Sequence, residues 1–135
     1  MVLAIDFDGT LVEHEYPKIG KDKLFAFETL KKLQKQGHIL ILWTYRAGKD
    51  LQQAVDYCKQ KGVEFYAVNK NHPEEVFDEN TISRKIYADV YIDDRNVGGF
   101  LGWSKIWKIL NNEDIETQMK EENFNKPSFF KKLFG

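Results

Sequence analysis

The hydrophobic positions of this chain alternate between short continuous runs and stretches with helical spacing. Apolar runs of strand length occur at 2–5, 38–43, 63–68 and 89–92. Continuous runs of this kind are typical of parallel strands that are buried on both faces. Apolar residues recur every three or four positions at 24–33, 51–58 and 103–110, and this spacing predicts three helices.

The order of these elements predicts the fold class. Strand and helix alternate along the chain, which implies right-handed parallel crossovers. We therefore expect an α/β fold: a three-layer, Rossmann-like parallel sheet flanked by helices. In such sheets ligands bind at the carboxyl ends of the strands. Asp6, Thr44 and Asp93 each follow an apolar run, so we expect these three residues at one edge of the sheet.

The length and composition predict a single folded domain. The chain has 135 residues, of which 42% are apolar and 30% charged, as in globular proteins and unlike disordered ones. We predict one domain over 1–135, with a core at about 2–111 and a charged, Phe-rich C-terminal extension at 112–135. We expect the rings of the extension to cover part of the same domain.

Charge and cysteine content exclude several classes of function. With 20 basic and 21 acidic residues, no general field favours nucleic acid or an anionic membrane. The longest apolar run, 39–43, is far shorter than the ~20 residues that span a bilayer. Cys58 is the single cysteine, so no internal disulfide and no cysteine-based zinc site is expected. These features predict a cytoplasmic protein without membrane partners or specific nucleic-acid binding.

Two carboxylates near the N-terminus carry the strongest chemical signal. Asp6 and Asp8 are two positions apart, so in an extended chain both point to the same side, and Gly9 permits a sharp exit from the strand. Magnesium prefers oxygen ligands, which suits a carboxylate pair without a neighbouring His or Cys. A solvated turn uses the same residue types, so this pair alone is not specific.

Four motifs in order resemble those of the haloacid dehalogenase superfamily. The first is the Ala-Ile-Asp-Phe-Asp-Gly-Thr-Leu stretch at 4–11, and the second is Thr44 at the end of an apolar strand. Lys85 is the candidate for the third motif, and Asp93 with Asp94 forms the fourth. The resemblance covers about residues 2–111. It implies a Mg²⁺-dependent phosphomonoester hydrolase of the phosphatase type, acting through an aspartyl-phosphate.

The resemblance also implies a role for each motif residue. Asp6 would be the nucleophile and Asp8 the general acid and base. Thr44 would hydrogen-bond the phosphoryl group, and Lys85 would offset its negative charge. The Mg²⁺ would be held by Asp6, Asp8 and Asp93. The adjacent Asp94 would bind it through a water molecule or orient its neighbours.

Several nearby residues leave alternatives open. Lys85 stands beside Arg84, and a lone lysine on a surface is often merely solvated. Arg46, two residues beyond Thr44, could bind a second anionic group of the substrate or serve as a structural ion-pair partner. Tyr45, Asn69 and His72 could line the entrance. The histidines show no metal-ligand spacing, and we interpret them as noncatalytic: His14, His38 and His72.

The spacing of the motifs leaves no room for an inserted cap domain, because the predicted core elements fill each interval. An open site would favour bulky substrates or shielding by a second copy of the chain. The expected partner is thus a phosphorylated small molecule or macromolecular end. The alternative is a noncatalytic phosphoacceptor or binding module, such as a signalling receiver. Asp8 argues against it, because a receiver needs no proton shuttle two residues beyond its acceptor.

Overall fold

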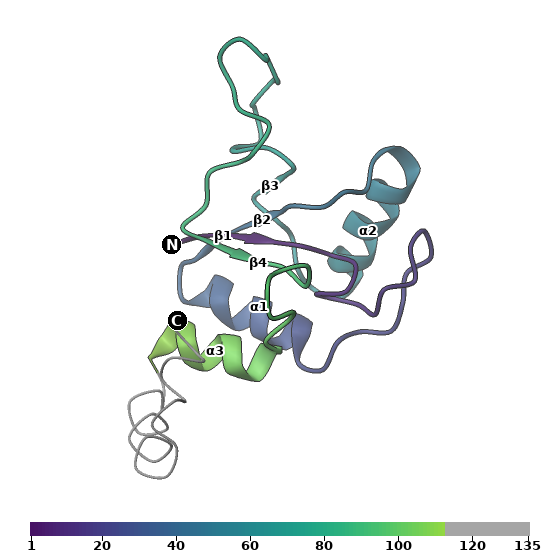
Figure 1. Ribbon diagram of the computed structural model, residues 1–135, viewed down its shortest axis with the longest axis vertical. Helices are drawn as coiled ribbons and strands as arrows, with labels where there is room; N and C mark the ends of the chain where they lie inside the picture. The colour runs from purple at the N-terminus through teal and green to yellow at the C-terminus, as the bar shows by residue number, and fades with distance from the viewer. Residues whose placement is uncertain (113–135) are drawn as a thin grey trace. The chain divides into compact units, whose positions relative to one another are not determined.

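The computed structural model describes residues 1–112, and the chain divides into two compact units, Met1–Leu101 and Gly102–Gly135. In the first unit the elements are β1 (Val2–Ile5), α1 (Ala26–Lys35), β2 (Ile39–Leu42), α2 (Gly48–Gln60), β3 (Ala67–Val68) and β4 (Val90–Ile92). The second unit contains α3 (Trp103–Asn111) (Figure 1). Most of the predicted C-terminal extension, 113–135, lies outside the described residues.

The four strands form one parallel sheet in the order β3-β2-β1-β4. In the centre, Ala4 of β1 pairs with Ile41 on one side and Tyr91 on the other. From β1 the chain moves to its neighbour β2 and then, on the same side, to β3. Because such parallel crossovers are right-handed, α1 and α2 lie on the same face of the sheet. The predicted α/β, Rossmann-like parallel sheet is confirmed.

The second face of the sheet is covered by an irregular segment, 69–89. Its residues Ile86 and Ala88 pack with one buried side chain from each of three strands: Ala4, Ile41 and Ala67. Two of these three are alanines, which lets the segment approach the sheet closely. The rest of the segment projects as a long loop (Figure 1). Its base is closed where the Tyr87 N–H donates to Asn71 Oδ1 over 2.7 Å.

Two predicted elements have different bounds in the structure. The first helix begins at Ala26 rather than at 24, because Phe25 adopts a left-handed conformation with φ 64° that a helix cannot include. The third strand, predicted at 63–68, is limited to Ala67–Val68 at the edge of the sheet.

Residues 1–112 contain no helix of the length and apolar character that crossing a bilayer requires. Within the same range, the elements that connect the motifs belong to the sheet, its helices and its loops, and none forms a cap domain.

The burial pattern along β2 predicts unequal effects of two matched substitutions. Ile41 is 1% exposed and Ile39 is 41% exposed on the same strand. Ile41→Ala should lower the free energy of unfolding by about 2–5 kcal/mol, because it leaves a cavity against the 69–89 segment. Ile39→Ala should cost less than about 1 kcal/mol. Urea unfolding measures both, and equal losses would contradict this packing.

Candidate active site

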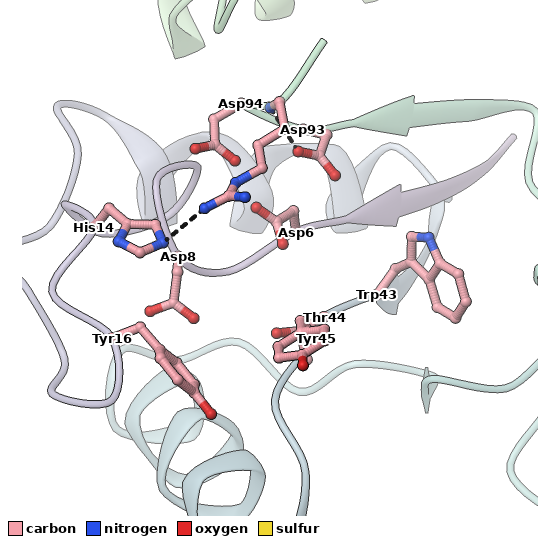
Figure 2. A pocket seen from close by; sticks show the side chains of 10 residues that line it. Asp6, Asp8, His14, Tyr16, Trp43, Thr44, Tyr45, Asp93 and Asp94 are labelled. Carbon is pink, nitrogen blue, oxygen red and sulfur yellow. Dashed lines mark hydrogen bonds between the residues drawn. The ribbon is translucent and has the colours of Figure 1, made fainter.

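The carboxyl ends of β1, β2 and β4 meet at one pocket of ≈ 430 Å³. Asp6, Thr44 and Asp93, which the sequence predicts at a common edge, all line it. The other lining residues come from the same strand ends and from the loops that follow them (Figure 2): Asp8, His14, Tyr16, Trp43, Tyr45, Asp94 and Arg95.

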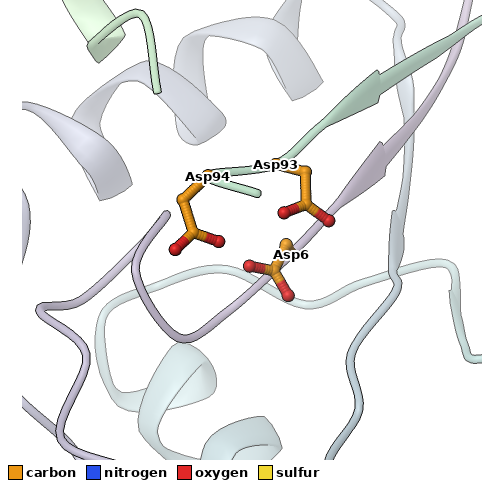
Figure 3. A group of neighbouring side chains, drawn as sticks. All are labelled: Asp6, Asp93 and Asp94. Atoms are coloured by element: carbon orange, nitrogen blue, oxygen red, sulfur yellow. The ribbon is translucent and has the colours of Figure 1, made fainter. Parts of the chain in front are cut away.

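Three carboxylates form a cluster within this pocket (Figure 3). One oxygen each of Asp6, Asp93 and Asp94 lies within 4.8 Å of the other two. An all-oxygen donor set of this size suits Mg²⁺. The cluster differs from the predicted metal ligands in one member. Asp94 belongs to it, whereas the carboxylate of Asp8 binds an arginine instead.

Among residues 1–112, no ion pair with a basic side chain offsets the charge of this cluster. The pKa of Asp6 is raised to about 8, first by burial, then by the negative charge of Asp93 and by a hydrogen bond with Asp94. A hydrogen bond from Thr10 Oγ1 to Asp6 Oδ2, over 3.0 Å, opposes this rise only in part. A divalent cation among the three carboxylates would remove the repulsion, so these residues fit the metal that the sequence predicts.

Gly9 makes the close approach of Asp94 possible. Its φ is +83°, and a Cβ atom at this position would lie 2.0 Å from Asp94 Oδ2. Any side chain would therefore displace the Asp94 carboxylate from the cluster. Gly9 thus serves the site through its missing side chain as well as through the turn it permits.

Asp8 is held in a different environment, by Arg46. The Arg46 Nε–H donates to Asp8 Oδ2 over 2.8 Å, and Nη2 donates to Oδ1 over 2.7 Å. This two-point pairing fixes the plane of the carboxylate as well as its position. The arginine side chain is 0% exposed, and it lies between the rings of Phe7 and Tyr16, with Cζ 5.1 Å from each ring centroid.

The remaining donors of Arg46 bind backbone carbonyls. Nη1 donates to Pro17 O over 2.9 Å and to Asp50 O over 3.2 Å, and Nη2 donates to Lys18 O over 2.9 Å. The five N–H donors of a guanidinium are thereby all used. Of the two predicted alternatives, the structure favours the ion pair, because Arg46 has no donor left for an anionic group of a substrate.

Two hydrogen bonds hold Thr44, one with the residue that follows β3 and one within its own loop. Its backbone N–H donates to Asn69 Oδ1 over 2.8 Å, and its Oγ1 accepts from the Arg46 backbone N–H over 3.2 Å. Because Oγ1 acts as the acceptor, its own hydrogen remains available to a ligand in the pocket. Asn69, predicted at the entrance, does not line the pocket but holds the Thr44 backbone through this bond. His72, predicted with it, is likewise absent from the pocket lining.

Lys85 does not line the pocket. Its Nζ lies 4.8 Å from the ring centroid of Tyr91. Tyr91 is the strand partner of Ala4, whose side chain packs against the 69–89 segment on the second face of the sheet. The contact of Lys85 with a phosphoryl group therefore stays a prediction from the sequence. The segment 69–89 carries this lysine over the face of the sheet and away from the edge where the strands end.

Two other cations, which sequence reasoning passed over, directly follow the ends of strands or of the motifs at those ends. Lys70 follows Asn69 directly after β3, and Arg95 follows the acidic pair after β4. The Arg95 backbone N–H donates to Asp93 Oδ1 over 2.8 Å, and its Nη2 lies 3.4 Å from His14 Nε2. Both positions could have been found by extending to β3 and β4 the rule that functional residues follow strand ends.

Comparison with known proteins agrees with this geometry. A model of the haloacid dehalogenase-like hydrolase family matches residues 3–133. The chain belongs to this family. The hydrolase is also similar to a conserved protein from Bacteroides thetaiotaomicron of known structure, with 50% identity and a TM-score of 0.79 over 84% of this chain and 91% of that one. Among curated proteins, none matches the hydrolase.

The contact between Gly9 and Asp94 predicts how the hydrolase responds to magnesium. Mg²⁺ at ten times its Kd should stabilise the wild type by about 1.4 kcal/mol, which raises the unfolding midpoint by roughly 3–8 °C. Gly9→Ala should remove most of this shift, because the new methyl group displaces the Asp94 carboxylate.

Gly37→Ala is the matched control for this effect. Its φ of +92° imposes similar backbone strain, but no atom lies within 4 Å of the added Cβ. Both variants should lose stability without metal, and thermal unfolding should show the magnesium shift only in Gly37→Ala. An equal shift in both variants would contradict a metal site that includes Asp94.

Proposed function

We propose that this hydrolase is a Mg²⁺-dependent phosphomonoester hydrolase that acts through an aspartyl-phosphate. One observation carries the proposal: two carboxylates two residues apart occupy opposite environments. Asp6 belongs to an acidic cluster, and Asp8 is bound by a buried arginine. Carboxylates in contrasting environments are suited to different roles in one reaction.

In the first step, Asp6 attacks phosphorus in line with the leaving oxygen. The bond between phosphorus and that oxygen breaks, and Asp8 supplies the proton that the leaving alcohol requires. Arg46 orients Asp8 for this transfer through its two hydrogen bonds. The Thr44 hydroxyl donates to a phosphoryl oxygen and positions it for attack.

In the second step, water attacks phosphorus of the aspartyl-phosphate. Asp8 takes a proton from this water, the bond from phosphorus to the Asp6 oxygen breaks, and inorganic phosphate leaves. The proton that Asp8 takes from water replaces the one that it gave to the leaving alcohol. The acid of the first step is thus the base of the second.

Asp6, Asp93 and Asp94 would hold the Mg²⁺, whose charge reduces the repulsion between the carboxylate nucleophile and the anionic phosphate. The same charge favours the ionised form of Asp6, which the attack requires. Lys70 and Arg95 also follow strand ends, and in this proposal they would supply the positive charge that the sequence predicts for Lys85. Arg95 lines the pocket, and Lys70 follows Asn69, which binds the Thr44 N–H.

Removal of Asp6 and removal of Asp8 should each lower turnover, for different reasons. Asp6→Asn removes the nucleophile, so phosphate release from a generic aryl phosphate with Mg²⁺ should fall to background. Asp8→Asn removes the proton transfer, with an expected loss of about 10²–10⁴-fold. A phosphate-release assay with and without Mg²⁺ measures both.

Wild-type release no faster than that of Asp6→Asn would refute the proposal. A chain that becomes phosphorylated on Asp6 but releases no phosphate would instead be the noncatalytic phosphoacceptor. Mass spectrometry of the intact protein separates the two cases.

The two lysines provide a matched test of the phosphate-binding charge. Lys70→Met should lower kcat/KM by about 10²-fold, the scale observed when a single stabilising donor is lost. Lys85→Met should stay within about twofold of the wild type, because its ammonium lies over Tyr91. The reverse order of effects would restore Lys85 to the site.

A further inference from the structure

We propose that the substrates of this pocket are nucleoside monophosphates, whose base stacks against Tyr45 and Tyr16 at its mouth. This inference rests on the proposed phosphomonoesterase function and adds the class of leaving group. Its basis is an aromatic surface beside the catalytic carboxylates that the chemistry of phosphate release does not require.

Tyr45 is the most exposed part of this surface. The residue is 93% exposed although it lines the pocket. Its ring contact within the chain is an edge contact with Tyr16, with centroids 6.4 Å apart and planes at 69°. An edge contact leaves the face of a ring open. Packing therefore does not account for a large aromatic side chain at this position.

Tyr16 gives the surface a fixed support. Its ring lies 5.1 Å from Arg46 Cζ, and that guanidinium is immobilised by Asp8 and by three backbone carbonyls. The edge contact then places Tyr45 against a ring that is already positioned. A surface that is ordered before the ligand arrives reduces the entropic cost of binding.

The aromatic surface lies on the side from which the alcohol departs. Asp8 protonates the leaving oxygen, and Tyr16 stacks on the arginine that holds Asp8. Tyr45 directly follows Thr44, which binds the phosphoryl group in the proposed mechanism. Figure 2 shows Tyr16 and Tyr45 on the opposite side of Asp6 from Asp93 and Asp94. A leaving group that departs past Asp8 therefore meets these rings.

A nucleoside fits this arrangement better than the other common phosphate esters. The pocket of ≈ 430 Å³ is within the range of small-molecule sites and larger than a phosphate group needs. The ribose spaces the base from phosphorus, so phosphate can reach Asp6 while the base reaches the mouth. An aryl phosphate would place its ring beside Asp8, and a sugar phosphate would leave Tyr45 without a partner.

The test compares AMP with ribose 5-phosphate, in which phosphate leaves the same 5′-oxygen of ribose and only AMP carries a base. The wild type should hydrolyse AMP with a kcat/KM about tenfold higher or more, the scale of one base stacking on an aromatic ring. Tyr45→Ala should bring the AMP to ribose 5-phosphate ratio near one, and Tyr45→Phe should retain it. Tyr66→Ala, an exposed tyrosine outside the pocket lining, should also retain the ratio.

Equal kcat/KM values for the two substrates in the wild type would overturn the inference. So would a Tyr45→Ala variant that keeps the wild-type ratio, or a preference for phosphotyrosine over AMP. If neither substrate is hydrolysed, the proposed function fails but the inference is still decided. Calorimetry on Asp6→Asn with Mg²⁺ then measures both ligands, and binding of AMP no tighter than that of ribose 5-phosphate overturns it.

Discussion

Repulsion between carboxylates is the constraint on which this site depends. An aspartate directly follows each of the neighbouring parallel strands β1 and β4, so the sheet itself brings Asp6 close to Asp93 and Asp94. Burial makes the repulsion stronger, as the raised pKa of Asp6 shows. Gly9 removes the side chain that would otherwise separate them. The fold thus builds a cluster of carboxylates whose mutual repulsion a divalent cation would relieve.

Arg46 divides the carboxylates between two tasks. Without it, Asp8 would add a further negative charge to a pocket that already holds three. Asp8 is paired with a guanidinium that also binds the carbonyls of Pro17, Lys18 and Asp50, so its carboxylate is held in place while it still lines the pocket. The same arginine supports the ring of Tyr16. In the proposed mechanism, both the position of Asp8 and the shape of the mouth therefore depend on one buried side chain.

The sequence predicts which residues meet at the carboxyl ends of the strands, but it does not predict the side-chain contacts that they make there. Apolar runs locate strand ends, and parallel strands end at one edge, so Asp6, Thr44 and Asp93 were expected together. The pairing of Asp8 with Arg46 joins residues 38 positions apart and leaves no local pattern. Lys85 was chosen by its distance in sequence from the fourth motif, and that distance carried no information about the path of the 69–89 segment over the second face.

Anomalous diffraction from crystals grown with Mn²⁺ in place of Mg²⁺ tests the central claim most directly. The account predicts one peak at the carboxyl edge of the sheet, bound by oxygens of Asp6, Asp93 and Asp94, with Asp8 still paired to Arg46. A site without a peak, or an ion bound by Asp8 after release of Arg46, would contradict it.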